Sequence, residues 1–325
     1  MVEAFRLDPR PKLWPMPVMA PVFRSSGDLI ADRRYDYAAA ALAEGDAAAA
    51  ADLFAQACDI APRWAAAWFG LGEALELAGE AERAAAAYQR AGACDGGDEL
   101  GATLRHARLA GLSPPAPPAS YIRALFDQYA PRFDRHLRED LGYRGPEILV
   151  SALREVCAAH GRTFHFDRVL DLGCGTGLFG RALYPHVDSL HGVDLSPKMV
   201  EAARATGCYS QVDAADLLAF LQGEGEGSAD LVVAADVLVY LGDLAGVFRE
   251  SARVCEAGGL FAFTVQAMDG ADYALGDDLR YAHSSDYIRR LARDSGFEVA
   301  RLERVSTRRE AHRDAPGLAV VLARP

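Results

Sequence analysis

The sequence lacks the features that identify several large classes of protein. No apolar run approaches the roughly 20 residues that a membrane-spanning helix needs. Residues 1–23 carry charges and prolines where a signal peptide would be apolar, so we expect a cytoplasmic protein. The six cysteines form no CxxC pair and the eight histidines form no HExxH spacing, which predicts reduced thiols and no metal site.

Positive charge is also scarce relative to negative charge. The formal net charge is −12 at pH 7, and this acidic balance argues against a nucleic-acid partner. The 51% hydrophobic and 25% charged residues are typical of a globular protein. With 325 residues the chain is long enough for two domains, each with its own core. We expect no membrane partner and leave homo-oligomerisation open.

The N-terminal part contains an internal repeat with a period of 34 residues, the interval from Gly45 to Gly79. The second copy, WFGLGEALELAGEAERAAAAYQRA, is similar to a tetratricopeptide helix–turn–helix repeat. The first copy is less complete, with Arg34 and Ala38 in place of the tryptophan and its glycine. The alternative is two alanine-rich helical hairpins that match through low complexity. The other recurring pairs are Ala50 and Ala84, Phe54 and Tyr88, and Ala57 and Ala91.

The chain divides into five segments at changes in composition. SPPAPPAS contains four prolines in eight residues, which predicts an extended, semi-rigid spacer. Two repeats are too few to bury their own end faces, so we expect them to pack against the following domain or a second chain. The segments are an N-terminal extended arm (1–34), a tetratricopeptide-like helical domain (35–112), the proline-rich linker (113–120), a helical cap (121–160) and an α/β core (161–325).

From residue 167 onward, short β-type runs alternate with helical segments. This alternation predicts a parallel sheet with helices on both faces. The last two runs, FEVARLERVS and GLAVVLARP, are joined without a helix and predict a closing antiparallel hairpin. We therefore expect an α/β fold with a Rossmann-like sheet of seven strands, preceded by an all-α domain.

The stretch VLDLGCGTGLFG places three glycines in one turn between an expected strand and an expected helix. Gly173, Gly175 and Gly177 remove side chains from that turn, so a ligand can approach the backbone closely. A tight turn that needs only one glycine is the alternative. Ligands of open parallel sheets bind beyond the carboxyl ends of the strands, where this turn lies. Asp194 ends the next expected strand, and its carboxylate could accept both ribose hydroxyls of an adenosine.

This pattern alone would also suit an enzyme that uses a dinucleotide. The glycine spacing is G-x-G-x-G, however, whereas the dinucleotide fingerprint is G-x-G-x-x-G, although Gly180 allows a looser match. An acid, Asp171, lies just ahead of the glycines, and the sheet is expected to end in a hairpin. These details favour a different cofactor that contains adenosine.

From Tyr121 to Pro325 the chain resembles the class I S-adenosylmethionine-dependent methyltransferases. With its repeats it is similar to bacterial methyltransferases that carry tetratricopeptide repeats at the N-terminus. The motifs that carry the resemblance are DLGCGTG, GVDLSPKMVEAAR, VDAADLLAFL, ADLVVAADVLVYLGDL and GGLFAFTV. The resemblance implies S-adenosylmethionine as cofactor and S-adenosylhomocysteine as product.

The resemblance also implies roles for matched positions. Asp171 and the glycine turn would face the methionine part of the cofactor, Asp194 the ribose, and Asp216 the adenine amino group, with Asp213 as the weaker alternative to Asp216. Cys174 is also explained as a small turn residue, and Met199 as a core residue. The implied cofactor-binding residues are Tyr129, Phe133, Asp171, Gly173, Cys174, Gly175, Gly177, Asp194, Leu195, Met199, Asp216, Leu217 and Asp236.

The acceptor side of the expected reaction is less defined than the donor side. Transfer of a methyl group is an in-line displacement, and a general base is needed only when the acceptor stays protonated near neutral pH. His283, expected in the loop after the fifth strand, is a candidate base, with a histidine bonded to backbone as the alternative. Tyr240 is the second catalytic candidate, with helix packing as its alternative. Tyr129, His136 and Tyr281 complete the acceptor-side candidates.

We therefore expect a methyltransferase that acts on an unidentified acceptor, either a small molecule or a peptide or protein recruited through the repeats. A non-catalytic assembly module that senses the cofactor is one alternative function. A dinucleotide-dependent oxidoreductase is the other, and its glycine spacing and terminal topology fit less well. The sequence does not choose between oxygen, nitrogen and carbon acceptors.

Overall fold

The helical part of the chain begins earlier than the sequence predicts. The computed structural model describes residues 25–310 and 313–325, so most of the expected N-terminal arm (1–34) lies outside the described residues. Helix α1 starts at Leu29, inside that expected arm. The expected boundary is therefore wrong, because Asp28 caps the helix by accepting hydrogen bonds from two backbone N–H groups of the first turn.

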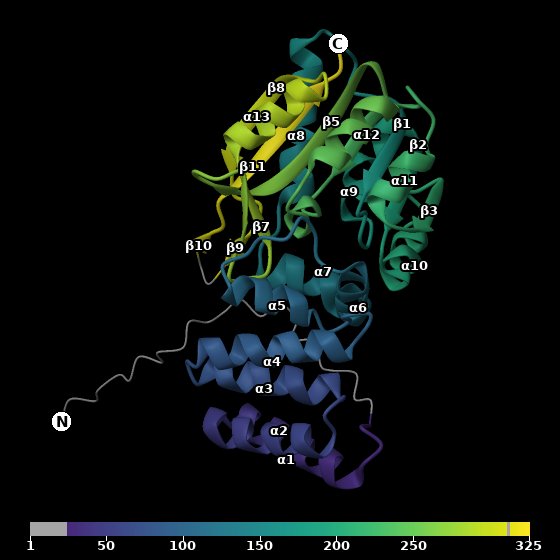
Figure 1. The fold of residues 1–325 in the computed structure, drawn as a ribbon. Coiled ribbons are helices and arrows are strands. Elements are labelled where there is room, and N and C mark those ends of the chain that lie inside the picture. Colours follow the sequence, from purple (N-terminus) through teal and green to yellow (C-terminus); the bar gives the residue numbers. More distant parts are fainter. Residues whose placement is uncertain (1–24, 311–312) are drawn as a thin grey trace, which may run out of the picture.

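The N-terminal helices stack as two hairpins followed by a further helix, below the sheet in the view of Figure 1. Recurring positions are buried in the same way in both hairpins: Ala50 and Ala84 are both fully buried. A Cβ on Gly72 would lie 2.6 Å from the Tyr88 ring, so glycine lets the two helices of the second hairpin approach closely. Their identity as tetratricopeptide repeats stays a prediction. The helices are α1 (Leu29–Glu44), α2 (Ala47–Ile60), α3 (Ala65–Leu77), α4 (Ala81–Cys94) and α5 (Ala102–Leu109).

The proline-rich linker lies along the α/β domain and is not a free spacer. The backbone N–H groups of Gly242 and Asp243 donate to the Pro115 carbonyl at 2.9 and 3.0 Å. The backbone N–H of Leu275 donates to Ser113 Oγ at 3.0 Å. Proline has no N–H, so this stretch pairs with its neighbours as a hydrogen-bond acceptor. The predicted spacer is thus docked on the domain, a contact that the sequence does not predict.

The helical cap is fixed to the loops that follow the first two strands. Asp127 accepts a hydrogen bond from Ser196 Oγ at 2.6 Å, and Asp134 accepts one from Thr176 Oγ1. A 3-10 turn that contains Pro131 interrupts the cap between its first two helices. The cap elements are α6 (Ala119–Tyr129), the 3-10 turn (Ala130–Arg132), α7 (Phe133–Arg135), a π-helical turn (His136–Asp140) and α8 (Gly145–Ala159).

The α/β domain is built on one sheet whose main path has the strand order β3-β2-β1-β4-β5-β11-β8. β1 to β5 run parallel, and β11 is antiparallel to both β5 and β8, so the predicted closing hairpin is confirmed. The expected seven strands are too few, because β7 pairs in parallel with the end of β5 and β6 pairs with β7. The strands are β1 (Phe166–Leu172), β2 (Val187–Asp194), β3 (Gln211–Ala214), β4 (Ala229–Ala234), β5 (Cys255–Met268), β6 (Tyr273–Leu275), β7 (Tyr281–Ser284), β8 (Glu298–Val305) and β11 (Gly317–Ala323), with a separate pair β9 (Arg309–Glu310) and β10 (Arg313–Asp314).

Helices cover both faces of the sheet, as the alternation of elements predicts (Figure 1). Leu153 of α8 and Phe179 of α9 are buried in the cluster on one face, and Phe248 of α12 and Ile288 of α13 in the cluster on the other. None of the described helices is long and apolar enough to cross a membrane. The remaining helices are α9 (Leu178–Leu183), α10 (Pro197–Ala205), α11 (Leu217–Gly223), α12 (Ala245–Val254) and α13 (Ser285–Asp294).

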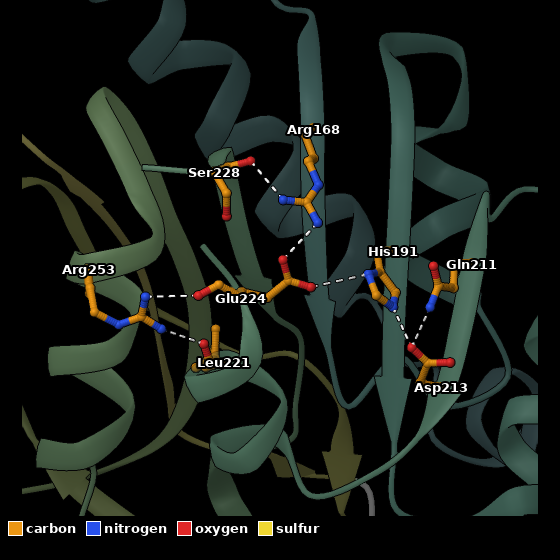
Figure 2. A network of polar contacts seen from close by, with 8 residues as sticks. All are labelled: Arg168, His191, Gln211, Asp213, Leu221, Glu224, Ser228 and Arg253. Carbon is orange, nitrogen blue, oxygen red and sulfur yellow. Dashed lines mark hydrogen bonds and ion pairs between the residues drawn. The ribbon is translucent and has the colours of Figure 1, made fainter. Parts of the chain in front are cut away.

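A polar network ties the end of α11 to three strands of the sheet (Figure 2). Glu224 accepts a hydrogen bond from Arg168 Nη2 of β1 at 2.7 Å, and its second carboxylate oxygen lies 3.4 Å from Nδ1 of His191 on β2. His191 Nε2 lies 2.8 Å from the Asp213 carboxylate on β3. Arg253 of α12 donates to the Glu224 carbonyl at 2.9 Å. This network fixes the C-terminal end of α11 against the sheet.

A shortened protein that begins at Ser120 is expected to be less stable than the full chain. It would lose the linker hydrogen bonds at Pro115 and the packing of Tyr121 against Gly101, where a Cβ would lie 2.6 Å from the ring. We expect the thermal midpoint to fall by at least about 5 °C in scanning calorimetry, because each kcal/mol lost shifts a domain of this size by about 2–4 °C. A protein that begins at Gly27 is the control. Equal midpoints for all three proteins would contradict the observed packing.

Candidate active site

A cavity of about 170 Å³ lies at the carboxyl ends of the parallel strands, between the glycine turn, the cap and the linker. Ala116 and Pro117 of the linker form part of its wall. The lining also includes eleven of the expected cofactor-binding residues and one catalytic candidate. They are Tyr129, Phe133, Asp171, Gly173, Cys174, Gly175, Asp194, Leu195, Asp216, Leu217, Asp236 and Tyr240.

The glycine turn needs glycine for conformation as well as for space. Gly173 and Gly175 have φ values of 64° and 54°, in the left-handed region that other residues rarely adopt. A Cβ on Gly173 would lie 2.3 Å from the Val237 side chain, so this position tolerates no side chain. A Cβ on Gly175 would lie 3.7 Å from the Phe133 ring, so Phe133 lies across the turn. The turn and the cap thus form opposite walls.

Asp171 is a buried carboxylate in the wall of the cavity. Its Oδ2 accepts a hydrogen bond from the Tyr209 hydroxyl at 2.7 Å, whereas the buried Oδ1 has no hydrogen-bond partner among the described residues. Burial raises the pKa of Asp171 to about 7, against the lowering effect of the Tyr209 hydrogen bond. A buried acceptor without a partner is costly. A ligand with a hydrogen-bond donor or a positive charge would remove that cost.

Asp194 joins the end of β2 to the glycine turn. Its Oδ2 accepts a hydrogen bond from the backbone N–H of Gly175 at 3.0 Å, and its Oδ1 accepts one from that of Ser196 at 2.8 Å. Burial raises the pKa of Asp194 to about 6, while the two backbone N–H groups lower it. At pH 8 the carboxylate is therefore ionised. Each oxygen retains a further lone pair for hydroxyl donors.

Asp216 and Leu217 reach the cavity from the start of α11. Asp216 caps this helix, because its Oδ1 accepts hydrogen bonds from the backbone N–H groups of Leu218 and Ala219 at 2.9 and 3.0 Å. Asp213, the alternative from the sequence, is not in the lining and pairs with His191 instead (Figure 2). The geometry therefore favours Asp216 over Asp213.

Asp236 lies where β4 ends, in a strained backbone conformation. Its φ is 58°, which is uncommon for a residue other than glycine. Its Oδ1 pairs with Arg308 Nη1 at 3.0 Å, and its backbone N–H donates to Thr264 Oγ1 at 2.9 Å. Its carboxylate is held by Arg308, which is only 3% exposed at its side chain. A buried partner of this kind keeps the Asp236 side chain in one place.

The cap contributes a continuous row of aromatic rings. The Tyr129 and Phe133 ring centroids are 5.1 Å apart, those of Phe126 and Phe133 are 6.2 Å apart, and those of Phe126 and Tyr240 are 5.2 Å apart. Arg280 follows Tyr240, with Nη2 donating to the Tyr240 hydroxyl at 3.2 Å. This row therefore runs from the glycine turn, near Phe133, to Arg280.

Three predicted site residues lie outside the cavity lining: Gly177, Met199 and His283. Gly177 immediately precedes α9. A Cβ at this position would lie 3.0 Å from the Tyr209 ring, so Gly177 packs against Tyr209 and is not part of the cavity lining. Met199 is fully buried in α10, which matches its core alternative. Neither position presents a surface to a ligand in this cavity. The implied contacts of both residues with a cofactor therefore have no geometric support.

His283 is not in a loop, contrary to expectation, but in strand β7. It is fully buried outside the cavity lining, and its Nε2 lies 3.1 Å from the Gly242 carbonyl oxygen. Because a carbonyl can only accept, Nε2 carries the proton in this contact. Burial lowers the pKa of His283 to about 4. The alternative from the sequence, a histidine bonded to backbone, describes this geometry.

Several residues of the site carry no local signal in the sequence. Asp127 and Asp134 hold the cap in place, Tyr209 holds Asp171, and Arg280 reaches the cavity from the turn between β6 and β7. Of these residues only Tyr209 has a related signal in the sequence, the glycines at positions 180 and 192. Its ring packs against both, and a Cβ on Gly180 or Gly192 would lie 2.5 or 2.8 Å from the ring. The other lining residues that the sequence did not single out are Ala116, Pro117, Ala119, Ile122, Phe126, Leu137, Leu141, Tyr143, Pro146, Thr176, Leu178, Phe179, Val193, Ala215, Ala235, Val237, Leu241 and Arg280.

Metal-binding geometry is found away from this cavity. His165, Asp167 and Asp188 bring possible ligand atoms within 4.8 Å of one another, but all three residues are exposed. They lie at the starts of β1 and β2, whereas the cavity lies where these strands end. Exposed clusters of this kind are common without an ion, and the expectation of no metal site stays a prediction.

Comparison with known proteins identifies the domain that contains the cavity. Residues 170–263 match the family model described as methyltransferase domain. The chain is 34% identical to methyltransferase-like protein 27 of Homo sapiens over 115 residues, covering 35% of this chain and 45% of that protein. It is 32% identical to the ubiquinone biosynthesis O-methyltransferase of Xanthomonas oryzae pv. oryzae over 118 residues, covering 33% and 49%. The chain thus spans about half the length of these curated relatives.

A solved structure shares the fold. The 1,6-didemethyltoxoflavin-N1-methyltransferase of Burkholderia thailandensis, with 1,6-didemethyltoxoflavin and S-adenosylhomocysteine bound, aligns with a TM-score of 0.51 and 18% identity. The match covers 65% of this chain and 92% of that one. Residues 170–263 are therefore similar to a methyltransferase domain, and the chain shares its Rossmann-like fold with that solved structure.

Proposed function

We propose that this chain transfers the methyl group of S-adenosylmethionine to an acceptor bound in the cavity. The observation that carries the proposal is Asp171, a residue of the cavity lining next to the glycine turn, whose buried Oδ1 has no partner among the described residues. An amino group or a cationic ligand would supply the missing interaction. The methyltransferase domain at residues 170–263 supports the same function.

The residues present fit the cofactor group by group. Asp171 would receive its amino group, Asp194 its ribose hydroxyls, and Leu195 and Leu217 would pack against its adenine. Asp171, Asp194 and Asp216 line the cavity without an arginine or lysine partner among the described residues, which favours a ligand with positive charge, and the cofactor would supply a methyl group on a cationic sulfur. Phe133 would exclude water from the side opposite Gly175.

The acceptor side contains no well-placed general base among the two candidates. Burial raises the pKa of Tyr240, so its hydroxyl stays protonated at neutral pH. Since that hydroxyl already accepts a hydrogen bond from Arg280, its own proton is available to donate. Tyr240 is thus suited to orient an acceptor. His283 is fully buried outside the cavity lining. We propose an acceptor that binds with its nucleophilic lone pair already free.

We propose that the two helical hairpins are tetratricopeptide repeats that pack against the domain without touching the acceptor. Their spacing supports the first part, because positions 34 residues apart such as Phe54 and Tyr88 are both buried. For the second part, the cavity lining contains no residue from 29–109 among those the structure describes. A role of the repeats in recruiting a peptide or protein partner stays a separate proposal.

The function is tested by ligand binding followed by methyl transfer. In calorimetry we expect S-adenosylhomocysteine to bind with a Kd in the micromolar range and NAD not to bind, because Asp194 and Gly175 form a site for adenosine without a pyrophosphate fingerprint. Incubation with labelled S-adenosylmethionine and fractionated cell extract should then label an acceptor. Tighter binding of NAD would favour the oxidoreductase. Binding without any transfer would favour the cofactor-sensing module.

A further inference from the structure

The order of the strands divides the cavity into two ends. Asp171, Asp194 and Leu217, which the proposed function assigns to the cofactor, lie at or just after the ends of β1, β2 and β3, and these strands are neighbours in the sheet. Tyr240 follows β4, which lies on the other side of β1. A cofactor held over β1 to β3 would leave the part of the cavity next to β4 to the acceptor. We call this part the acceptor end, lined by Ala116, Pro117, Phe126, Tyr240 and Leu241.

Apolar side chains form most of the acceptor end. The rings of Phe126 and Tyr240 meet edge-on, with centroids 5.2 Å apart. The linker completes the wall, because the Pro115 carbonyl accepts the backbone N–H of Gly242 and so holds the linker beside Leu241. A pocket with apolar walls favours an apolar ligand that a few polar groups orient.

Packed side chains close the acceptor end toward the helical hairpins. Tyr240 belongs to one buried cluster with Leu104 of α5 and with Tyr121 and Leu125 of α6. Among the residues that the structure describes, none from 29–109 lines the cavity. The acceptor end therefore suits a small molecule, and a segment of a macromolecule would not reach it from the hairpins.

The charged side chains near the acceptor end are engaged within the protein. The Asp236 carboxylate pairs with Arg308 at 3.0 Å. Arg280 donates to the Tyr240 hydroxyl at 3.2 Å and is likewise not free. An ionic acceptor would give up its hydration without a free opposite charge to receive it, which is costly in an apolar pocket. The acceptor end therefore favours an uncharged molecule.

The Tyr240 hydroxyl gives the acceptor end a directional hydrogen-bond donor. Its oxygen accepts from Arg280, and no described residue accepts the hydroxyl proton in return. A buried donor without an acceptor is costly, so a ligand oxygen that accepts this proton would be favoured. A carbonyl oxygen meets this need without adding a charge.

We infer that the acceptor is a small, uncharged, largely apolar molecule whose carbonyl-type oxygen accepts the Tyr240 hydroxyl proton, while its apolar body packs against Phe126 and Pro117. This inference rests on the proposed function and names the chemical class of its substrate. Tyr240 is a positioning residue, which orients the acceptor and takes no part in bond making. The uncharged state of the acceptor is consistent with a nucleophilic lone pair that is already free.

The test uses probes of nearly equal shape on the intact protein. Acetophenone is the neutral ketone, α-methylstyrene lacks its oxygen, benzoate carries a negative charge and benzamidine a positive charge. Each is titrated by ligand-observed NMR with and without saturating S-adenosylhomocysteine. We expect acetophenone to bind in both states, and about fivefold or more tightly than either charged probe.

Two substitutions test the role of the hydroxyl. Tyr240→Phe should weaken acetophenone binding about fivefold and α-methylstyrene binding by less than about twofold, because only the ketone loses a hydrogen bond. A loss of packing would instead weaken both probes. Tyr184→Phe, altered at an exposed tyrosine outside the cavity lining, is the matched control and should change neither affinity.

Outcomes for this inference and for the proposed function are separate. The inference would be overturned by a charged probe that binds as tightly as acetophenone, by no acetophenone binding below about 10 mM, or by acetophenone binding that S-adenosylhomocysteine abolishes. An unchanged ratio of the two neutral affinities in Tyr240→Phe would also overturn it. Failure of S-adenosylhomocysteine to bind the unaltered protein would instead overturn the proposed function. Retained S-adenosylhomocysteine affinity in Tyr240→Phe shows that this protein is folded. If it is not retained, the ranking of the probes by the unaltered protein still decides.

Discussion

Replacing Asp194 by alanine is expected to weaken S-adenosylhomocysteine binding about 10–100-fold at pH 8, equivalent to about 1.4–2.8 kcal/mol. The proposed hydrogen bonds to the ribose hydroxyls would be lost, and water in the space left by the side chain would replace part of them, so the expected loss is about that of one hydrogen bond to a charged acceptor, about 1.5–3 kcal/mol. The backbone N–H groups of Gly175 and Ser196 would also lose their acceptor, which loosens the glycine turn. Isothermal calorimetry at pH 8, well above the pKa of about 6, measures the effect.

Asp213→Ala is the matched control for this substitution. Asp213 is the carboxylate in the neighbouring strand β3, where it pairs with His191 outside the cavity (Figure 2). We expect its removal to change the Kd for S-adenosylhomocysteine by less than about threefold, within the roughly 0.5 kcal/mol of most changes away from a site. An unchanged Kd in Asp194→Ala would contradict the ribose assignment, and so would equal losses in both proteins.

Replacing Asp171 by asparagine is expected to stabilise the ligand-free protein at pH 8 and to weaken binding of the cofactor. Folding raises the pKa of Asp171 from 3.8 to about 7, so the folded state binds this proton more tightly than the unfolded state. Stability then falls as the pH rises from about 4 to about 7, because ionisation of the buried carboxyl opposes folding. Each pKa unit is equivalent to about 1.4 kcal/mol, which gives an upper bound of about 4 kcal/mol at pH 8.

Asparagine removes this charge and keeps an acceptor oxygen for the Tyr209 hydroxyl. Urea unfolding at pH 5 and pH 8 should show that Asp171→Asn exceeds the unaltered protein in stability by a larger margin at pH 8. Calorimetry should show weaker binding of S-adenosylhomocysteine, whose amino group loses its proposed partner. Lower stability of Asp171→Asn at pH 8, with a normal fold by circular dichroism, would show that the Asp171 charge does not destabilise the ligand-free protein.

The parts of the site that the sequence predicts are those fixed by local order along the chain. Gly173, Gly175 and Asp171 follow β1, and Asp194 ends β2, so the rule that parallel strands end at one edge is sufficient to bring them together. The alternation of strands and helices likewise predicts a sheet with helices on both faces. In each case the sequence pattern lies within a few positions of the residues or elements that it predicts.

The residues that the sequence misses depend on contacts between distant segments. Arg280 reaches the cavity because β7 pairs with an extension of β5, and no periodic pattern in RYAHS distinguishes that short strand from a loop. For the same reason the sequence predicts His283 in a loop after the fifth strand, whereas the pairing of β7 buries it against Gly242. The role of Asp127 cannot be predicted for a related reason, because its partner, Ser196, is 69 positions away in the sequence.

The docked linker has a consequence for how such a protein can evolve or be redesigned. Ser113–Pro118 is at once the joint between two structural units and part of the wall of the cavity, through Ala116 and Pro117. In most modular proteins a domain can be exchanged at its joint without altering the chemistry of its neighbour. Here a recombination event or an insertion at this joint would also reshape the cavity wall. The helical unit and the shape of the cavity are therefore inherited together, as one exchangeable piece.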